Sequence, residues 1–143
     1  MSKTDLDQIA QSEAGCASIV IAAYATVSAY RGNVALPGEY TGFVNTLLSG
    51  TVPVTLMSLG NPYLIRSFAS AKAYVATFSP VTTSETAAVK AMFGEIAISG
   101  RLPVTIPGIA KYGDGIQLPA TRPPLPAAPT AHISTNHPNQ KGS

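Results

Sequence analysis

The sequence is short, ordinary in apolar content and poor in charge. Its 143 residues suffice for one domain and are too few for two. Charged residues make up only 11%, well below the usual share of about a quarter. The net charge is +2 and Lys and Arg never form a run, so we expect no nucleic-acid partner and no acidic-membrane partner.

The first third of the chain predicts a helix, a strand, a loop and a second helix. Residues 4–12 have helical spacing, and Thr4 or Asp5 is placed to cap that helix. The continuous apolar run Ala17–Tyr24 is typical of a strand covered on both faces of a parallel sheet. Gly and Pro residues predict a loop over 31–40, and a short helix follows over 43–48.

The alternation continues through the middle of the chain. We expect further strands at Val52–Leu59, Ala73–Phe78 and, at a sheet edge, Leu102–Ile106. A turn at 60–62 and a short helical segment over 63–68 separate the first two of these strands. The strongest helix signal is Ser84–Phe93, with Ser84 as its cap and Gly94 as its end.

This order of elements predicts an α/β fold: a mostly parallel sheet with right-handed crossovers and helices on both faces. In such sheets, ligands and partners meet the loops that follow the carboxyl ends of the strands. The polar and aromatic residues that we expect there to face a ligand or partner are Arg31, Asn33, Glu39, Asn61 and Tyr63. Each also has a structural alternative; that of Asn61 is an Asx turn before Pro62.

The end of the chain differs in composition. Leu118–Ser143 holds six of the twelve prolines and few large apolar residues, so it cannot bury enough surface to offset its ordering entropy. We therefore expect an α/β domain over 1–118 and a disordered Pro-rich tail over 119–143.

Targeting signals and disulfides are not expected. Met1–Glu13 is polar and lacks a secretory pattern, and Ala14–Tyr30 is short and too polar for a membrane helix. We therefore expect a cytoplasmic location and no membrane partner. Cys16 is the only cysteine, which excludes an internal disulfide, and we interpret it as a buried, inert thiol.

No catalytic set stands out in the sequence. The glycine motifs that cradle phosphates are missing, and both histidines, His132 and His137, lie in the predicted tail. The carboxylates of the predicted domain form no pair suited to glycoside hydrolysis; they are Glu39, Glu85, Glu95 and Asp114. We therefore expect no metal, no cofactor and no catalytic residue.

Three segments together resemble one family. The run from Ser58 through Gly60-Asn61-Pro62 to Tyr63 looks like a strand-to-turn segment of the C-terminal domain of family 3 glycoside hydrolases. The agreement continues over 87–96 and over 99–108, where Gly100-Arg101-Leu102-Pro103 resembles that domain's closing signature. The chain is most similar to the bacterial β-N-acetylglucosaminidase branch. The similarity covers about 6–118, so we expect a family α/β sandwich truncated at its N-terminal side.

The resemblance implies an accessory domain that packs on a catalytic (β/α)8 barrel and contacts sugar through its loops. In the family the barrel carries the nucleophile, and in this branch also a His-containing acid/base loop; this chain matches neither. We expect the isolated chain to be inactive and to associate with a barrel domain or subunit, or with itself. Two alternatives remain: a stand-alone hydrolase that uses Glu39 or Asp114, and a non-enzymatic, flavodoxin-like binding module.

Overall fold

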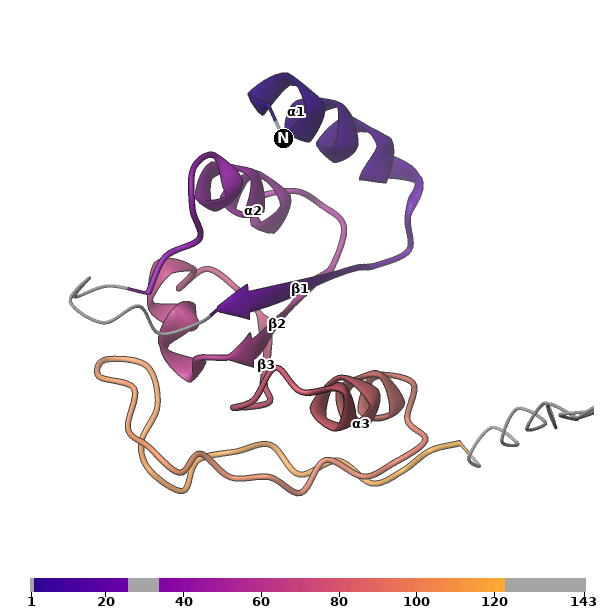
Figure 1. The fold of residues 1–143 in the computed structure, drawn as a ribbon. Coiled ribbons are helices and arrows are strands. Elements are labelled where there is room, and N and C mark those ends of the chain that lie inside the picture. Colours follow the sequence, from indigo (N-terminus) through magenta and orange to yellow (C-terminus); the bar gives the residue numbers. More distant parts are fainter. Residues whose placement is uncertain (1, 26–33, 123–143) are drawn as a thin grey trace, which may run out of the picture.

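The computed structural model of the protein describes residues 2–25 and 34–122, and its centre is a three-stranded parallel sheet (Figure 1). The strands are β1 (Ile19–Ala25), β2 (Val54–Gly60) and β3 (Ala73–Ala76), in the order β1-β2-β3. Helices α1 (Lys3–Ser12) and α2 (Tyr40–Leu48) lie on one side of the sheet, and α3 (Thr82–Met92) lies on the other. The predicted α/β fold, with helices on both faces of a parallel sheet, is confirmed.

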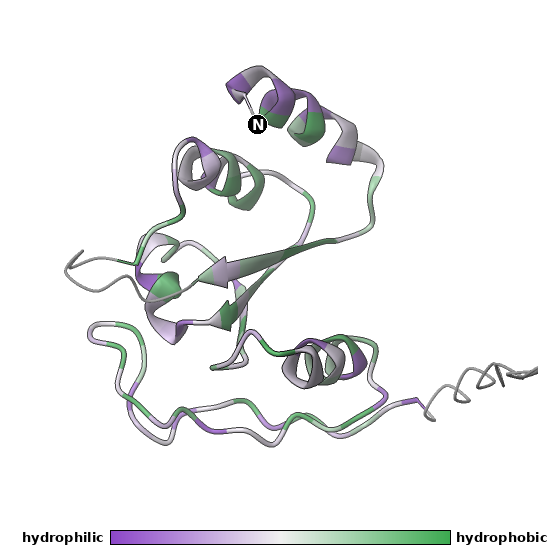
Figure 2. Ribbon diagram, viewed as in Figure 1, coloured by the Kyte–Doolittle hydropathy of each residue, from purple (hydrophilic) through white to green (hydrophobic). Residues whose placement is uncertain are grey.

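Short 3-10 helices complete the elements: η1 (Glu13–Gly15) follows α1, and η2 (Pro62–Ser67) follows β2. Figure 2 shows hydrophobic residues along α2 and the strands and a mostly hydrophilic α1. Among the helices of the described part of the chain, none is long and apolar enough to cross a membrane.

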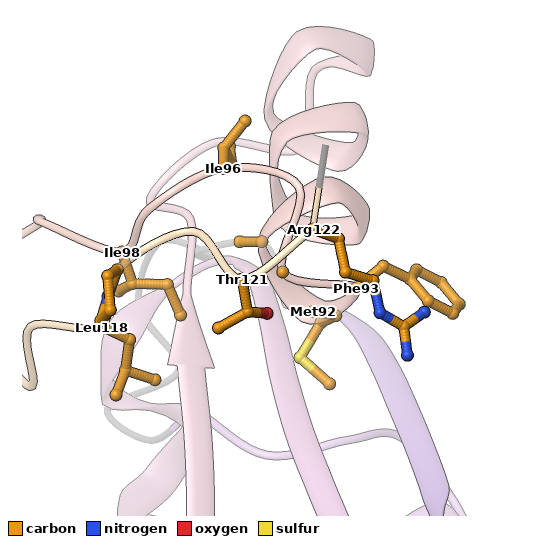
Figure 3. Close-up of a pocket in the computed structure, with 10 residues that line it drawn as sticks. Met92, Phe93, Ile96, Ile98, Leu118, Thr121 and Arg122 are labelled. Carbon is orange, nitrogen blue, oxygen red and sulfur yellow. The ribbon is translucent and has the colours of Figure 1, made fainter. Parts of the chain in front are cut away.

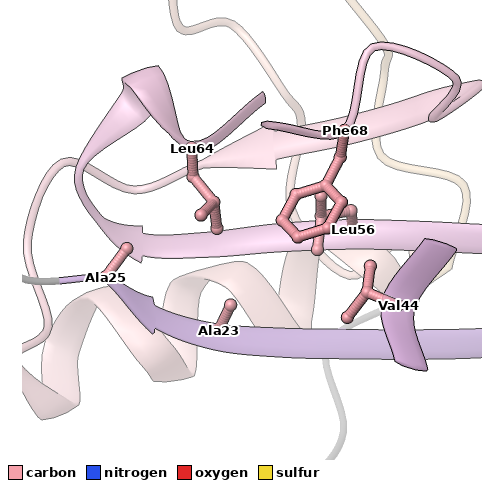
Figure 4. Packing of buried hydrophobic residues seen from close by; sticks show 6 residues of the cluster. All are labelled: Ala23, Ala25, Val44, Leu56, Leu64 and Phe68. Atoms are coloured by element: carbon pink, nitrogen blue, oxygen red, sulfur yellow. The ribbon is translucent and has the colours of Figure 1, made fainter. Parts of the chain in front are cut away.

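Two hydrophobic clusters hold the layers together, one on each face of the sheet. On the α2 face, Figure 4 shows Phe68 and Leu64 packed over Leu56 of β2, with small residues of β1 beside them. On the α3 face, Met57 and Leu59 of β2 pack against α3. Because side chains alternate along a strand, β2 supplies both clusters and is the most deeply buried strand.

Strand β1 is covered on one face only, which corrects the expectation of a strand buried on both. Its burial alternates along the strand: Ala23 and Ala25 are buried, whereas Val20 and Tyr24 are 50% and 59% exposed. The reason is the position of α3, whose Ala88 and Met92 pack on β2 and β3 rather than on β1.

The helix starts differ from the sequence prediction. Helix α1 begins at Lys3, one residue before the predicted start, because Ser2 is its N-cap residue and forms a reciprocal capping box with Asp5. Neither Thr4 nor Asp5 is therefore the N-cap residue, although Asp5 takes part in the cap from the third helical position. Helix α3 begins at Thr82 with Val81 as the cap residue, not Ser84. Its end is as predicted: Gly94 has φ 74°, and Glu95 N donates to Lys90 O, as in a Schellman motif.

The predicted edge strand Leu102–Ile106 is wrong. This segment is one arm of an antiparallel hairpin over residues 94–122, which runs along the α3 side of the sheet (Figure 1). The arms are bonded at every fourth residue in a constant register about Gly108; the pairs are Gly94 with Arg122, Ile98 with Leu118, Leu102 with Asp114, and Ile106 with Ala110.

The composition of this segment explains why it leaves the sheet. Pro103 and Pro107 have no N–H to donate to a ladder, and closing a short local loop costs less entropy than pairing with a distant strand. The described part of the predicted tail, residues 119–122, pairs with Gly94 at the base of the hairpin. The remainder, 123–143, lies outside the described residues.

Cys16 is exposed rather than buried. Its thiol donates to Glu13 Oε2 at 3.2 Å, and this hydrogen bond to a carboxylate raises the pKa of the Cys16 thiol. Because the thiolate is the reactive form, the hydrogen bond to Glu13, rather than burial, is what disfavours that form of Cys16.

Candidate functional site

The carboxyl edge of the sheet begins with a tight clamp between β1 and β2. Asn61 N donates to Ala25 O at 2.9 Å, directly beyond the last residue pair of the two strands, Ala25 and Gly60. Gly60 has φ 127°, and a Cβ atom there would lie 2.7 Å from Ala25 O. Only glycine fits both constraints, so this residue fixes the close approach of the two strand ends.

The turn after β2 uses its polar groups internally. Ser58 is fully buried, and its hydroxyl donates to Asn61 O at 2.6 Å. Asn61 is only 6% exposed, and its side-chain oxygen accepts from Tyr63 N at 2.9 Å. This is the Asx turn expected before Pro62, and it starts η2 with proline in the first turn.

The end of β3 is tied to the same turn. Thr77 N donates to Ser58 O at 3.0 Å, and the Tyr74 hydroxyl donates to Pro62 O at 2.9 Å. Burial raises the pKa of Tyr74, which keeps its phenol in the protonated, donating form. The carboxyl edge over β2 and β3 is therefore a rigid, internally bonded surface.

Phe78 is an exposed aromatic residue at this edge that was not among the residues predicted to face a ligand. It follows β3, has φ 61° and is 40% exposed. A bulky residue in the left-handed region is uncommon and strained, and such strain concentrates at functional sites. No local sequence signal reveals it, because Phe78 reads as the last apolar residue of a strand.

The strain at Phe78 can be measured with two substitutions that remove the same ring. We expect Phe78→Gly to be about 1 kcal/mol more stable than Phe78→Ala, because glycine adopts a positive φ without the Cβ clash that alanine retains. Urea denaturation of both variants gives this difference. Equal stabilities, or a more stable alanine variant, would show that the backbone relaxes and stores no strain here.

The sequence model of the glycosyl hydrolase family 3 C-terminal domain matches residues 3–137, almost the whole chain. The chain belongs to this family. Separate comparisons with curated proteins and with solved structures found no match.

The residues predicted to face a ligand occupy different places in this family 3 domain. Asn61 and Tyr63 lie together in the turn after β2, where Tyr63 is half-buried. Glu39 is exposed and directly precedes α2, where its side chain makes no capping bond. Arg31 and Asn33 lie outside the described residues.

The two carboxylates considered for a stand-alone hydrolase come from opposite layers of the family 3 domain. Glu39 adjoins α2 on one side of the sheet, whereas Asp114 belongs to the hairpin on the other (Figure 1). Asp114 Oδ2 accepts from Lys111 N at 2.7 Å, as in a local turn. In the described part of the chain, no group of three or more metal-binding side chains occurs.

A hollow lies where α3 meets the base of the hairpin (Figure 3). It has a volume of about 360 Å³ and is lined mainly by apolar side chains, among them Met92, Ile98 and Leu118. Arg122 is its one charged lining residue among those described. The hollow lacks the converging polar groups of a ligand site. We interpret it as the gap left where α3 packs against the hairpin of this family 3 domain.

Proposed function

We propose that this domain is the accessory part of a glycoside hydrolase of the β-N-acetylglucosaminidase type, and that it packs on a catalytic (β/α)8 barrel outside this chain. The observation that carries the proposal is the family match over residues 3–137. Hydrolysis of a glycosidic bond requires a nucleophile and a general acid/base held on either side of that bond. The barrel supplies that chemistry, and this domain supplies part of the wall around the sugar.

The wall in this proposal is the carboxyl edge of the sheet. Its internal bonds, such as Ser58 Oγ to Asn61 O and Thr77 N to Ser58 O, hold it rigid without help from a ligand. Phe78 lies two residues after β3 at that edge and is 40% exposed. An exposed aromatic side chain on a rigid support suits the lining of a binding site, because such sites are largely preformed and rich in aromatic residues.

The remaining loop residues join this wall as part of the same proposal. Tyr63 is positioned by its own backbone bond to Asn61, and Glu39 is an exposed carboxylate before α2. Arg31 and Asn33 follow β1 in the sequence and complete the set of groups that we assign to sugar or barrel contact. A cytoplasmic location, where no disulfide is needed, agrees with the single cysteine.

Reconstitution tests the proposed function. The chain alone should hydrolyse an aryl β-N-acetylglucosaminide at background rate, and addition of a family 3 catalytic barrel from the same source should give turnover that depends on the chain. A matched aryl β-glucoside should react more slowly if the glucosaminidase assignment is correct.

In the reconstituted enzyme, Phe78→Ala should raise KM roughly three- to ten-fold, whereas Phe93→Ala, which alters an exposed ring elsewhere, should not.

Two results would contradict the proposal. If the barrel turns over substrate equally well with and without the chain, the accessory role is lost. If the isolated chain is active and either Glu39→Ala or Asp114→Ala abolishes that activity, the chain is a stand-alone hydrolase instead.

A further inference from the structure

Strand β1 ends the sheet on one side and leaves backbone groups unpaired. Along a parallel ladder, alternate residues bond to the same neighbouring strand, and the bonds from Ile19 N to Pro53 O and from Asn61 N to Ala25 O mark which residues of β1 face β2. The residues between, Val20, Ala22 and Tyr24, therefore direct their N–H and C=O groups to the open edge. No described residue pairs with that edge.

This edge lacks the features that usually protect an open strand. Natural edges carry charges, prolines or bulges that prevent pairing with another chain. The sequence from Ala14 to Tyr30 contains no Asp, Glu, Lys, Arg or Pro, and the register of β1 on β2 is continuous, without a bulge. The backbone template along β1 is thus both open and uncharged.

The side chains of Val20, Ala22 and Tyr24 are also exposed to solvent on the α3 face of the sheet. Val20 and Tyr24 are 50% and 59% exposed, and Ala22 between them is exposed as well. Helix α3 is joined to β1 by the Tyr24 hydroxyl, which donates to Glu85 Oε1 at 3.1 Å. An occupant of the edge would therefore gain apolar contact in addition to backbone bonds.

We propose that a second copy of this chain occupies the edge, with the two β1 strands antiparallel about a two-fold axis at Ala22. This register sets Ala22 opposite its equivalent and Val20 opposite Tyr24 of the second copy, so that each pair exchanges two backbone bonds. The two three-stranded sheets become one continuous sheet. This inference goes beyond the proposed function and uses a surface other than the carboxyl edge.

The side chains favour a second copy over an unrelated strand. Val20 with Tyr24 is a β-branched residue beside an aromatic ring, a favourable cross-strand pair that the two-fold axis forms twice. Ala22 at the axis is small and uncharged, so two copies meet there without a steric clash or repulsion. The edge is therefore complementary to itself, as a two-fold interface requires.

Disulfide trapping tests the register. In a Cys16→Ser background, Ala22→Cys should cross-link two copies under mild oxidation, because Cα atoms of such a pair lie about 5.5 Å apart, within the range for a disulfide. Val20→Cys is the matched control. Two thiols at position 20 would be separated by about 13 Å along the strand and should not cross-link. Cross-linking of both variants, or of neither, would overturn the proposal.

Oligomeric state provides an independent measurement. The full chain should be a dimer by light scattering on a size-exclusion column, and Ala22→Lys should weaken dimerisation at least ten-fold because it sets like charges opposite each other. Ala73→Lys places the same charge on the opposite edge strand, where Ala73 is also exposed, and should remain dimeric. A monomeric wild-type chain would overturn the proposal, whatever the result of the barrel reconstitution.

Discussion

Gly60→Ala should lower the free energy of unfolding by about 3 kcal/mol. The new Cβ would lie 2.7 Å from Ala25 O, at a residue whose φ is 127°. Backbone strain of about 1–3 kcal/mol is expected from the conformation alone. Relief of the clash would require Ala25 to move, and this would break the bond from Asn61 N that joins the ends of β1 and β2.

Urea denaturation measures this effect, and Gly42→Ala is its matched control. Gly42 lies in α2 outside the left-handed region, and a Cβ atom there would meet nothing within 4 Å beyond the backbone of its own helix. Alanine there should stabilise the domain by about 0.5–1 kcal/mol, because glycine disfavours a helix interior. If both alanine variants had the same stability, the clamp at Gly60 would not be rigid.

Phe68→Ala should lower the free energy of unfolding by about 3–5 kcal/mol. Phe68 is 1% exposed, and its ring fills the cluster between η2 and β2, against Leu56 and Leu64 (Figure 4). Truncation leaves a cavity that its neighbours can refill only in part. Since small domains are stable by roughly 5–15 kcal/mol in total, a loss of this size should be evident as a large fall in thermal midpoint.

The matched control is Phe93→Ala, which removes the same ring from a side chain that is 60% exposed at the end of α3. We expect the free energy of unfolding to fall by about 1 kcal/mol or less, because most of the Phe93 ring is already exposed to solvent. Calorimetry of both variants gives the comparison. A Phe68→Ala variant as stable as Phe93→Ala would mean that the cluster on the α2 face is loosely packed.

The parallel sheet could be predicted because its signals are local. Continuous apolar runs marked β1 and β2, and turn residues such as Asn61 and Pro62 marked where a strand ends. The strand bounds moved by one or two residues, since Val52 and Pro53 precede β2 and Ala25 and Gly60 extend the pairing of β1 with β2. Extent of pairing depends on the neighbouring strand, which a local pattern does not describe.

Features that depend on distant neighbours were missed. The segment 102–106 has a strand-like pattern, but its partner is the following arm of its own hairpin rather than the sheet. The apolar run of β1 predicted cover on both faces, whereas α3 lies over β2 and β3. At the candidate site, the Asx turn of Asn61 was predictable from Pro62, while the left-handed backbone of Phe78 had no signal in the sequence.

The widely spaced bonds of the hairpin over 94–122 have a dynamic consequence. Successive backbone-bonded pairs, such as Ile98 with Leu118, are four residues apart, and between them the arms are joined by side-chain bonds such as Tyr112 N to Thr105 Oγ1. Such a structure opens stepwise and at low free-energy cost, unlike the central strands. Gly94 lies directly after the C-cap of α3 and also forms the base of the hairpin. Opening of the hairpin at its base therefore also frees the last turn of α3. The end of the helix and the hairpin thus form one unit of sub-global unfolding.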